Sequence, residues 1–478
     1  MLLCTAAVLG TCARAPTMLD EIHAVGELRV VTRDGPNTYF DSGGGPSGPE
    51  YELLQEFADH LQVPLRLIVV DRAADVLPMV ISGQAHLAAA GLTVNAENAR
   101  QVDFGPVYQQ VTEHLVYRDG RRRPQSVRQL RGKRLEVASG TSYVKTLART
   151  QALHPDLVWT ENPHTSQIEL LTRVADGTLD FTVVKSNAFA IYRSFIPEIR
   201  VAFNLAEGES LAWALAKRND ASLKNEVAQF FDNIRANGRL DAILDHYYGH
   251  MPRVNYVGTR QFTRDVMAYL PNYKGHFQAA AERYEVDWRL LAAIGYQESK
   301  WDPEAVSPTG VRGLMMLTEQ TAQTFGIEDR TDPRQSIRGG ARYLAYLLDK
   351  LPPQITGPDR TWFALAAYNI GYGHLLDARR LTRSRGGNPD QWADVRPNIK
   401  LLAVPEYYER TRHGYARGGE TVHFVENVRT YFNVLIWMNK DQGSAPGWMQ
   451  PSGVAPAIQA DNSERDKIRP VPVADNPA

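Results

Sequence analysis

The spacing of apolar residues changes near residue 252, and this change predicts that the chain folds as at least two unlike domains. Before it, short alternating segments that predict strands, such as 26–32, take turns with amphipathic segments that predict helices, such as 51–60. Strand–helix alternation of this kind is typical of a parallel α/β sheet. From 261 to about 440 the spacing is helical without strand alternation, which predicts a mainly α domain.

The two ends and the junction differ in composition from the domains. The tail is rich in Pro, Gly, Ala and Ser and has almost no apolar periodicity, so we expect it to be disordered. The predicted segments are 1–17, a signal or lipoprotein segment; 18–250, the α/β domain; 251–260, a linker; 261–440, the α domain; and 441–478, the tail.

Composition and cysteine placement exclude several classes of function. The formal net charge of −1 gives no overall electrostatic basis for binding nucleic acid. Both cysteines, Cys4 and Cys12, lie in the first dozen residues, so the folded body has none for disulfides, metal binding or thiol catalysis. His246 and His250 stand four residues apart without an evident third ligand. We therefore expect no metal site and no cofactor.

The first eleven residues are apolar and small, which suggests the core of a secretory signal, although no basic residue precedes them. Two processing sites compete. Leu9-Gly-Thr-Cys12 is close to a bacterial lipoprotein box, which makes Cys12 the lipidation candidate, and Ala13-Arg-Ala15 is an A-x-A cleavage site followed by Pro16. Lipidation at Cys12 is slightly favoured over cleavage after Ala15.

A carboxylate continues an apolar stripe in the α domain. Trp288, Leu291 and Ile294 recur at helical spacing, and Glu298 follows four residues after Ile294. Burial disfavours an ionised carboxyl and raises its pKa, so Glu298 can keep a proton near neutral pH and act as a general acid. The alternative is a glutamate whose stem packs while its carboxylate reaches water.

Two further segments and a late tyrosine complete a pattern with Glu298-Ser299. Residues 313–318 read Gly-Leu-Met-Met-Leu-Thr before a short helix that Thr318 can cap, and residues 366–371 read Ala-Ala-Tyr-Asn-Ile-Gly within another helix. In this order, with Tyr431 in a late helix, the pattern resembles the family 1 lytic transglycosylases, which have a goose-lysozyme-like fold. Most relatives have Gln where this chain has Met316, and the Met–Met form is typical of one branch.

The resemblance implies a peptidoglycan lytic exotransglycosylase with a single catalytic acid. Glu298 donates a proton to the glycosidic oxygen and then accepts the proton of the muramic acid C6 hydroxyl, which closes a 1,6-anhydro ring. Hydrolases of this bond normally use two carboxylates. Asp302 is the nearest second carboxylate in sequence, but Pro303 moves it out of helical geometry.

The same resemblance assigns the residues around the acid. Those expected to line the cleft or orient Glu298 are Ser299, Met315, Met316, Tyr368, Asn369 and Tyr431. Packing in the core is an equally good interpretation for Met315 and Tyr368. An Asn in an otherwise apolar helix has no propensity reason to be there, so Asn369 is the stronger candidate.

The α/β domain carries motifs of its own. Segments 26–30, 91–104 and 177–181, and the closing segment 230–248, resemble the bilobal periplasmic binding proteins of the amino-acid type. The resemblance implies a second lobe between about Gly120 and Ala212, with a ligand cleft between the lobes.

The predicted cleft departs from that family at both charged positions. Asn98 stands where amino-acid receptors have the Arg that binds the ligand carboxylate, unless Arg100 substitutes, and Lys185 stands where they have the Asp that binds the ammonium. Thr141 and Ser142 open a helix, whose amino end favours an anion. We expect an anionic ligand, a muropeptide or stem-peptide carboxylate; the alternative is a cleft that has lost ligand binding and serves as a spacer.

Together these patterns predict an α/β bilobal periplasmic-binding-protein-like domain followed by a mainly α, lysozyme-like domain. The expected function is cleavage of peptidoglycan glycan strands at the periplasmic face of the outer membrane of a Gram-negative envelope, with attachment by lipid or peripherally. Two alternatives remain open at this point: a hydrolytic muramidase of the same fold, and an envelope solute receptor that anchors to peptidoglycan.

Overall fold

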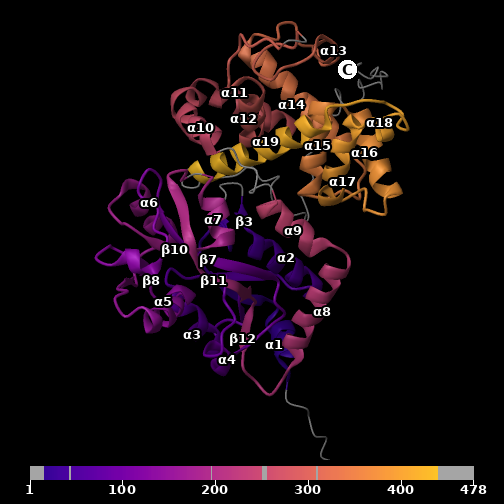
Figure 1. Cartoon of the computed structure of the whole chain (residues 1–478). Coiled ribbons are helices and arrows are strands. Elements are labelled where there is room, and N and C mark those ends of the chain that lie inside the picture. Colours follow the sequence, from indigo (N-terminus) through magenta and orange to yellow (C-terminus); the bar gives the residue numbers. More distant parts are fainter. Residues whose placement is uncertain (1–15, 42–44, 195, 250–255, 308–309, 440–478) are drawn as a thin grey trace, which may run out of the picture.

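The computed structural model describes residues 16–41, 45–194, 196–249, 256–307 and 310–439. An α/β domain and a helical domain follow each other along the chain, and Figure 1 shows them stacked with helix α19 along their boundary. The predictions for Cys12, for cleavage after Ala15 and for the tail lie outside the described residues.

Lobe 1 of the α/β domain contains both ends of the domain. Its five-stranded sheet has the order β4-β1-β5-β12-β6, in which β1 pairs in parallel with β4 and β5, and β12 is antiparallel to β5 and β6. Its elements are α1 (Met18–Val25), β1 (Leu28–Thr32), β2 (Phe40–Asp41), β3 (Pro46–Ser47), α2 (Pro49–Leu61), β4 (Leu65–Val69), η1 (Ala73–Asp75), α3 (Val76–Ile81), β5 (Leu87–Ala88), α4 (Asn98–Gln101), β6 (Val102–Phe104), β12 (Ala214–Ala216), α8 (Ser222–Ala236) and α9 (Arg239–Tyr248).

Lobe 2 is the segment of the chain from β7 to β11. The chain enters this lobe through the first of these two long strands and leaves it through the second. Its elements are β7 (Gln109–Arg118), η2 (Val127–Leu130), β8 (Glu136–Ala138), α5 (Ser142–Leu153), β9 (Thr160–Asn162), α6 (Gln167–Asp176), β10 (Thr182–Lys185), α7 (Ser186–Tyr192) and β11 (Ile199–Leu211). The sheet β10-β7-β11 is antiparallel, because β7 and β11 carry the chain in opposite directions, and β8 pairs in parallel with β9. The parallel pairing that the alternation at 26–90 predicts is present in lobe 1, where β1 lies between β4 and β5. Lobe 2 also begins at β7, before the predicted Gly120.

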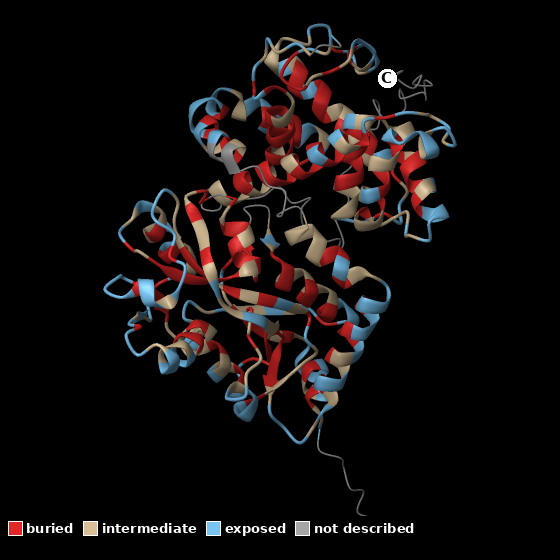
Figure 2. Cartoon of the chain, in the orientation of Figure 1, coloured by how far each residue is buried: buried red, intermediate tan, exposed pale blue. Residues whose placement is uncertain are grey.

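The second domain is mainly helical, and its loop segment carries isolated β-bridges from Arg312 to Val306 and to Leu317. Its elements are α10 (Tyr256–Ala268), α11 (Leu270–Tyr284), α12 (Trp288–Ser299), α13 (Glu319–Thr324), α14 (Pro333–Lys350), α15 (Asp359–Ile370), α16 (Tyr372–Ser384), α17 (Trp392–Ile399), η4 (Lys400–Ala403), α18 (Pro405–Tyr408) and α19 (Gly418–Met438). Helix α10 begins at Tyr256, inside the predicted linker 251–260, because helical spacing already continues there. Helix α12 is almost entirely buried, and Figure 2 shows buried residues concentrated on the inner helices of this domain.

Helix α19 is fixed to the end of α9 by a buried arginine. The Arg429 side chain, 1% exposed, donates from Nη2 to the carbonyl oxygens of Asp245 and His246, each at 2.7 Å. A cation at a helix carboxyl end is favourable because unpaired carbonyls and the helix dipole are negative there. Arg396 of α17 adds a bond from Nη1 to Asp245 Oδ1 at 3.1 Å. Among the described residues, the helices are all too short or too polar to cross a membrane.

Candidate functional site

Helix α12 ends just after Glu298. Asp287 caps its amino end by accepting from the Arg289 amide at 2.8 Å, and its last turn closes when the Lys300 amide donates to the Tyr296 carbonyl at 2.9 Å. Lys300 has a left-handed φ of 59°, which turns the chain away from the helix axis. Asp302 lies beyond this turn and is exposed, so Glu298 is the carboxyl that the helix directs inward.

The Glu298 carboxyl is electrostatically isolated. It is partly buried, and desolvation by burial raises its pKa from 4.5 to about 8. Among the described residues it has no hydrogen bond or ion pair, and no neighbouring charge is among the causes of its shift. The side chain therefore holds a proton at neutral pH, as a general acid must before reaction.

Ser299 joins α12 to the loop 313–317. Its Oγ lies 3.1 Å from the carbonyl oxygen of Gly295 and 2.9 Å from that of Leu314. The Ser299 hydroxyl is therefore hydrogen-bonded to the backbone. Met315, in the same loop, has no exposed surface. Its side chain is enclosed so tightly that a Cβ on Gly340 would lie 2.7 Å from the Met315 Cε. The packing interpretation therefore describes the Met315 side chain.

The loop itself has a strained turn that holds its shape. Gly313 has φ 81°, and a Cβ there would collide with the backbone oxygen of Arg330, so only glycine fits. Met316 follows with a left-handed φ of 46°, an uncommon conformation for a side-chain residue, and it is partly exposed. Backbone strain of this kind concentrates at functional sites.

Tyr368 and Asn369 face different directions from α15. Tyr368 is buried and donates to the Met315 carbonyl at 3.1 Å. Burial first, and then the nearby charge of Glu298, raise the pKa of Tyr368 well above its usual value. Asn369 is exposed, and its Oδ1 accepts from the Thr421 hydroxyl at 2.8 Å, which leaves its Nδ2 without a partner among the described residues.

Tyr431 supports the end of α12 from α19. It is 7% exposed, its ring centroid lies 4.9 Å from that of Tyr296 and 4.5 Å from that of Phe262, and the Lys300 Nζ lies 5.3 Å above it. The sequence did not indicate Thr421 or Lys300. Thr421 looks like an ordinary helix residue, because its partner Asn369 lies 52 positions away.

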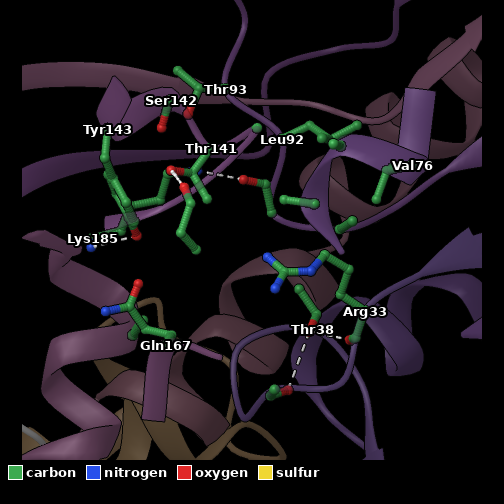
Figure 3. A pocket seen from close by; sticks show the side chains of 18 of the residues that line it. Arg33, Thr38, Val76, Leu92, Thr93, Thr141, Ser142, Tyr143, Gln167 and Lys185 are labelled. Atoms are coloured by element: carbon green, nitrogen blue, oxygen red, sulfur yellow. Dashed lines mark hydrogen bonds between the residues drawn. The ribbon is translucent and has the colours of Figure 1, made fainter. Parts of the chain in front are cut away.

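A second candidate site lies between the lobes of the α/β domain. A cavity of about 640 Å³ is lined by both lobes, including the amino ends of α5 and α6. Figure 3 shows the Arg33 guanidinium projecting into this space opposite Gln167 and Lys185. No local pattern in the sequence indicates Arg33. Burial lowers the pKa of its guanidinium from the usual value.

Lys185 crosses the cleft from lobe 2 to lobe 1. It is 8% exposed, and its Nζ donates to the carbonyl oxygen of Gly91 at 2.5 Å. Burial lowers the pKa of Lys185 to about 8, against the opposing effect of the Glu113 and Glu50 carboxylates. The cleft thus contains an ammonium group of the protein itself.

The other predicted cleft residues lie nearby, with one exception. Asn98 lines the cavity and accepts from Lys145 Nζ at 3.0 Å, and Thr141 donates to the Ala138 carbonyl at 2.7 Å. Ser142 opens α5, but its hydroxyl donates to the buried Glu113 carboxylate at 2.6 Å. Arg100 is exposed and lies outside the cavity lining, so it does not take the place of the missing arginine.

Each of the two domains matches a known protein family. The family described as "Transglycosylase SLT domain" matches residues 275–391, and "Bacterial extracellular solute-binding proteins, family 3" matches residues 28–250. The fold and the site therefore define an SLT-type lytic transglycosylase that carries a solute-binding-like domain at its amino end.

Relatives with similar sequences over most of their length identify the family within this class of lytic transglycosylases. A membrane-bound lytic murein transglycosylase F of Pseudomonas fluorescens is 45% identical over 438 residues, covering 91% of this chain and 90% of its own length. That of Alkalilimnicola ehrlichii is 47% identical over 420 residues, covering 88% and 85%. The chain belongs to the membrane-bound lytic murein transglycosylase F family.

Part of the chain is similar in structure to solved solute-binding proteins. A mutant of the arginine-binding protein of T. maritima aligns with a TM-score of 0.44 at 21% identity, covering 48% of this chain and 98% of that chain. A solute receptor for L-cysteine of Neisseria gonorrhoeae aligns with a TM-score of 0.44 at 24% identity, covering 48% and 92%.

Proposed function

We propose that this enzyme cleaves the β-1,4 bond between N-acetylmuramic acid and N-acetylglucosamine in murein, with Glu298 as its one catalytic carboxyl. The observation that carries this assignment is the isolation of Glu298, whose pKa is raised by desolvation with no contribution from a second carboxylate. Hydrolases of this bond hold two carboxyl groups roughly 5–10 Å apart. A single protonated acid suits a reaction in which the substrate supplies its own nucleophile.

In the first step, Glu298 transfers its proton to the glycosidic oxygen as the bond from the muramic acid C1 to that oxygen breaks. The N-acetyl oxygen of the substrate stabilises the positive charge at C1. The C6 hydroxyl oxygen then bonds to C1, and its proton passes to the Glu298 carboxylate, which restores the acid. No water enters the product, and the released end is 1,6-anhydromuramic acid.

Neighbouring side chains take positioning roles in this proposal. Asn369 presents its Nδ2 to the sugar while Thr421 holds its Oδ1. Tyr368, near the Glu298 charge, fixes the loop through the Met315 carbonyl. The remaining residues act on the cleft surface or behind it: Met316 at the surface, and Ser299, Met315 and Tyr431 as packing that holds Glu298 in place.

An isotope experiment tests this proposal. Purified sacculi are digested in water enriched in ¹⁸O, and the new muramic ends are analysed. Intramolecular closure by the C6 hydroxyl predicts ends without ¹⁸O. Incorporation of one labelled oxygen per cut would show that water attacks, which would contradict the proposal.

For the interlobe cleft we propose a regulatory ligand that is anionic and lacks a compact ammonium group, such as a muropeptide or stem-peptide carboxylate. Lys185 already places an ammonium at the Gly91 carbonyl, so a ligand ammonium would meet a like charge. The Glu113 carboxylate offsets the charge of Lys185 and accepts a hydrogen bond from Ser142 at the amino end of α5, whereas Arg33 and the amino end of α6 remain to attract an anion.

We place the protein at the periplasmic face of the outer membrane. Its relatives are named membrane-bound lytic murein transglycosylases, and a lipid on Cys12 would anchor this protein to a membrane. Mass spectrometry of the protein from envelopes distinguishes a lipidated amino end at Cys12 from cleavage after Ala15. An unprocessed amino end starting at Met1 would contradict both.

A further inference from the structure

The last helix of the transglycosylase domain reaches the cleft of the other domain. Trp437 of α19 is among the residues that line the interlobe cavity. Its ring centroid lies 5.8 Å from that of Phe40 in lobe 1 and 6.4 Å from that of Tyr192 in lobe 2, edge-to-face in both cases. One side chain of the catalytic domain therefore contacts both lobes at the cavity.

We propose that the ligand site of the cleft is shared between the two domains, with Trp437 as a binding residue. This inference rests on the proposed function of the cleft. The cavity lining includes the aromatic pair Trp437 and Tyr192, and it also includes polar groups, namely Lys185 and the amino end of α5. The ligand class is a carboxylate that also carries a sugar ring or an aliphatic portion, whose C–H surface packs on the indole.

The shared site connects the cleft to the catalytic centre through one rigid element. Arg429 fixes α19 to α9, and Trp437 follows eight residues later, about 12 Å along the helix axis. Thr421, earlier in α19, holds Asn369. A lobe movement that separates Phe40 from Tyr192 must break one contact of Trp437. Ligand binding and the position of α19 are then linked reciprocally.

Binding to the full-length protein tests the shared site. The probe is a muropeptide mixture released from sacculi by a muramidase, titrated into wild type, Trp437→Ala, Trp437→Phe and Trp159→Ala. Trp159 is a matched control, since it is partly buried in lobe 2 and outside the cavity lining. We expect affinity to fall roughly tenfold or more in Trp437→Ala and to stay within about threefold in the other two variants. Unchanged affinity in Trp437→Ala would overturn the inference.

Hydrogen exchange without any ligand separates this inference from the choice of ligand. If Trp437 joins both lobes, Trp437→Ala should speed exchange in the segment around Phe40 and in α7, while Trp437→Phe should not. Faster exchange confined to α19 would overturn the inference. If the wild type does not bind the probe, the proposed ligand is wrong, and the exchange pattern alone decides whether Trp437 joins the lobes.

Discussion

Thr421 on α19 donates its hydroxyl hydrogen to the Oδ1 of Asn369 on α15, at 2.8 Å. Thr421 is 1% exposed, whereas Asn369 is exposed. The buried Thr421 hydroxyl therefore fixes the orientation of the exposed Asn369 amide. Because its Oδ1 is held, the direction in which the Asn369 Nδ2 points is also fixed.

Replacing Thr421 by Val should lower turnover on sacculi about tenfold, because the amide of Asn369 loses its fixed orientation. The cost in unfolding free energy should be only about 1 kcal/mol, since the freed Oδ1 can bond water. Thr430→Val is the matched control, because Thr430 is also buried on α19 but donates only to the Glu426 carbonyl within the helix. Equal turnover in the two variants would show that the Thr421 bond has no functional role.

The desolvated carboxyl group of Glu298 should make the protein less stable as pH rises. Its pKa is about 8 when folded and near 4.5 when unfolded, so between these values the unfolded state loses a proton that the folded state keeps. Glu298→Gln should therefore raise the unfolding free energy by on the order of 1–3 kcal/mol at pH 7, and change it little at pH 4. Thermal unfolding at the two pH values, with the exposed Glu304→Gln as control, measures this difference; an equal effect at both would contradict it.

The raised pKa of Glu298 should also determine how kcat/KM depends on pH. The reaction needs protonated Glu298, so kcat/KM should fall about tenfold per pH unit above about 8. Lys185 also titrates near 8, but it lies in the other domain, so Lys185→Met should keep the same midpoint for the decline. A profile that stays flat to pH 10 would remove Glu298 as the acid.

The interlobe cleft should not take up free amino acids. The Lys185 Nζ is bonded to the Gly91 carbonyl oxygen, and Asn98 lines the cavity at the position where we expect an arginine in amino-acid receptors. Calorimetry of the full-length protein with glutamine and with arginine should give no binding in the micromolar range. Tight binding of either amino acid would show that the cleft keeps the specificity of ordinary receptors.

Much of the catalytic domain follows from local sequence. Thr318 caps α13 by accepting from the Thr321 amide at 3.1 Å, as its sequence position predicts, and α12 carries Glu298 on a buried helix. These features depend on residues a few positions apart. Lys185 and Asn98 both line the interlobe cavity.

Features that depend on distant residues were not predictable from one sequence. Apolar spacing identifies a strand but does not determine whether its partner runs parallel, so the sequence did not indicate the antiparallel sheet of lobe 2. Thr421 and Trp437 act on segments 52 or more positions away, and nothing in the local pattern of α19 distinguishes them from packing residues.

The most direct test of the account is the mass of the products that the wild-type protein and Glu298→Gln release from purified sacculi. We predict that the wild type releases muropeptides one water lighter than those of a muramidase, and that Glu298→Gln releases almost none while still binding sacculi. Products of hydrolytic mass, or substantial turnover by Glu298→Gln, would contradict the assignment of Glu298 as the single acid of a lytic transglycosylase.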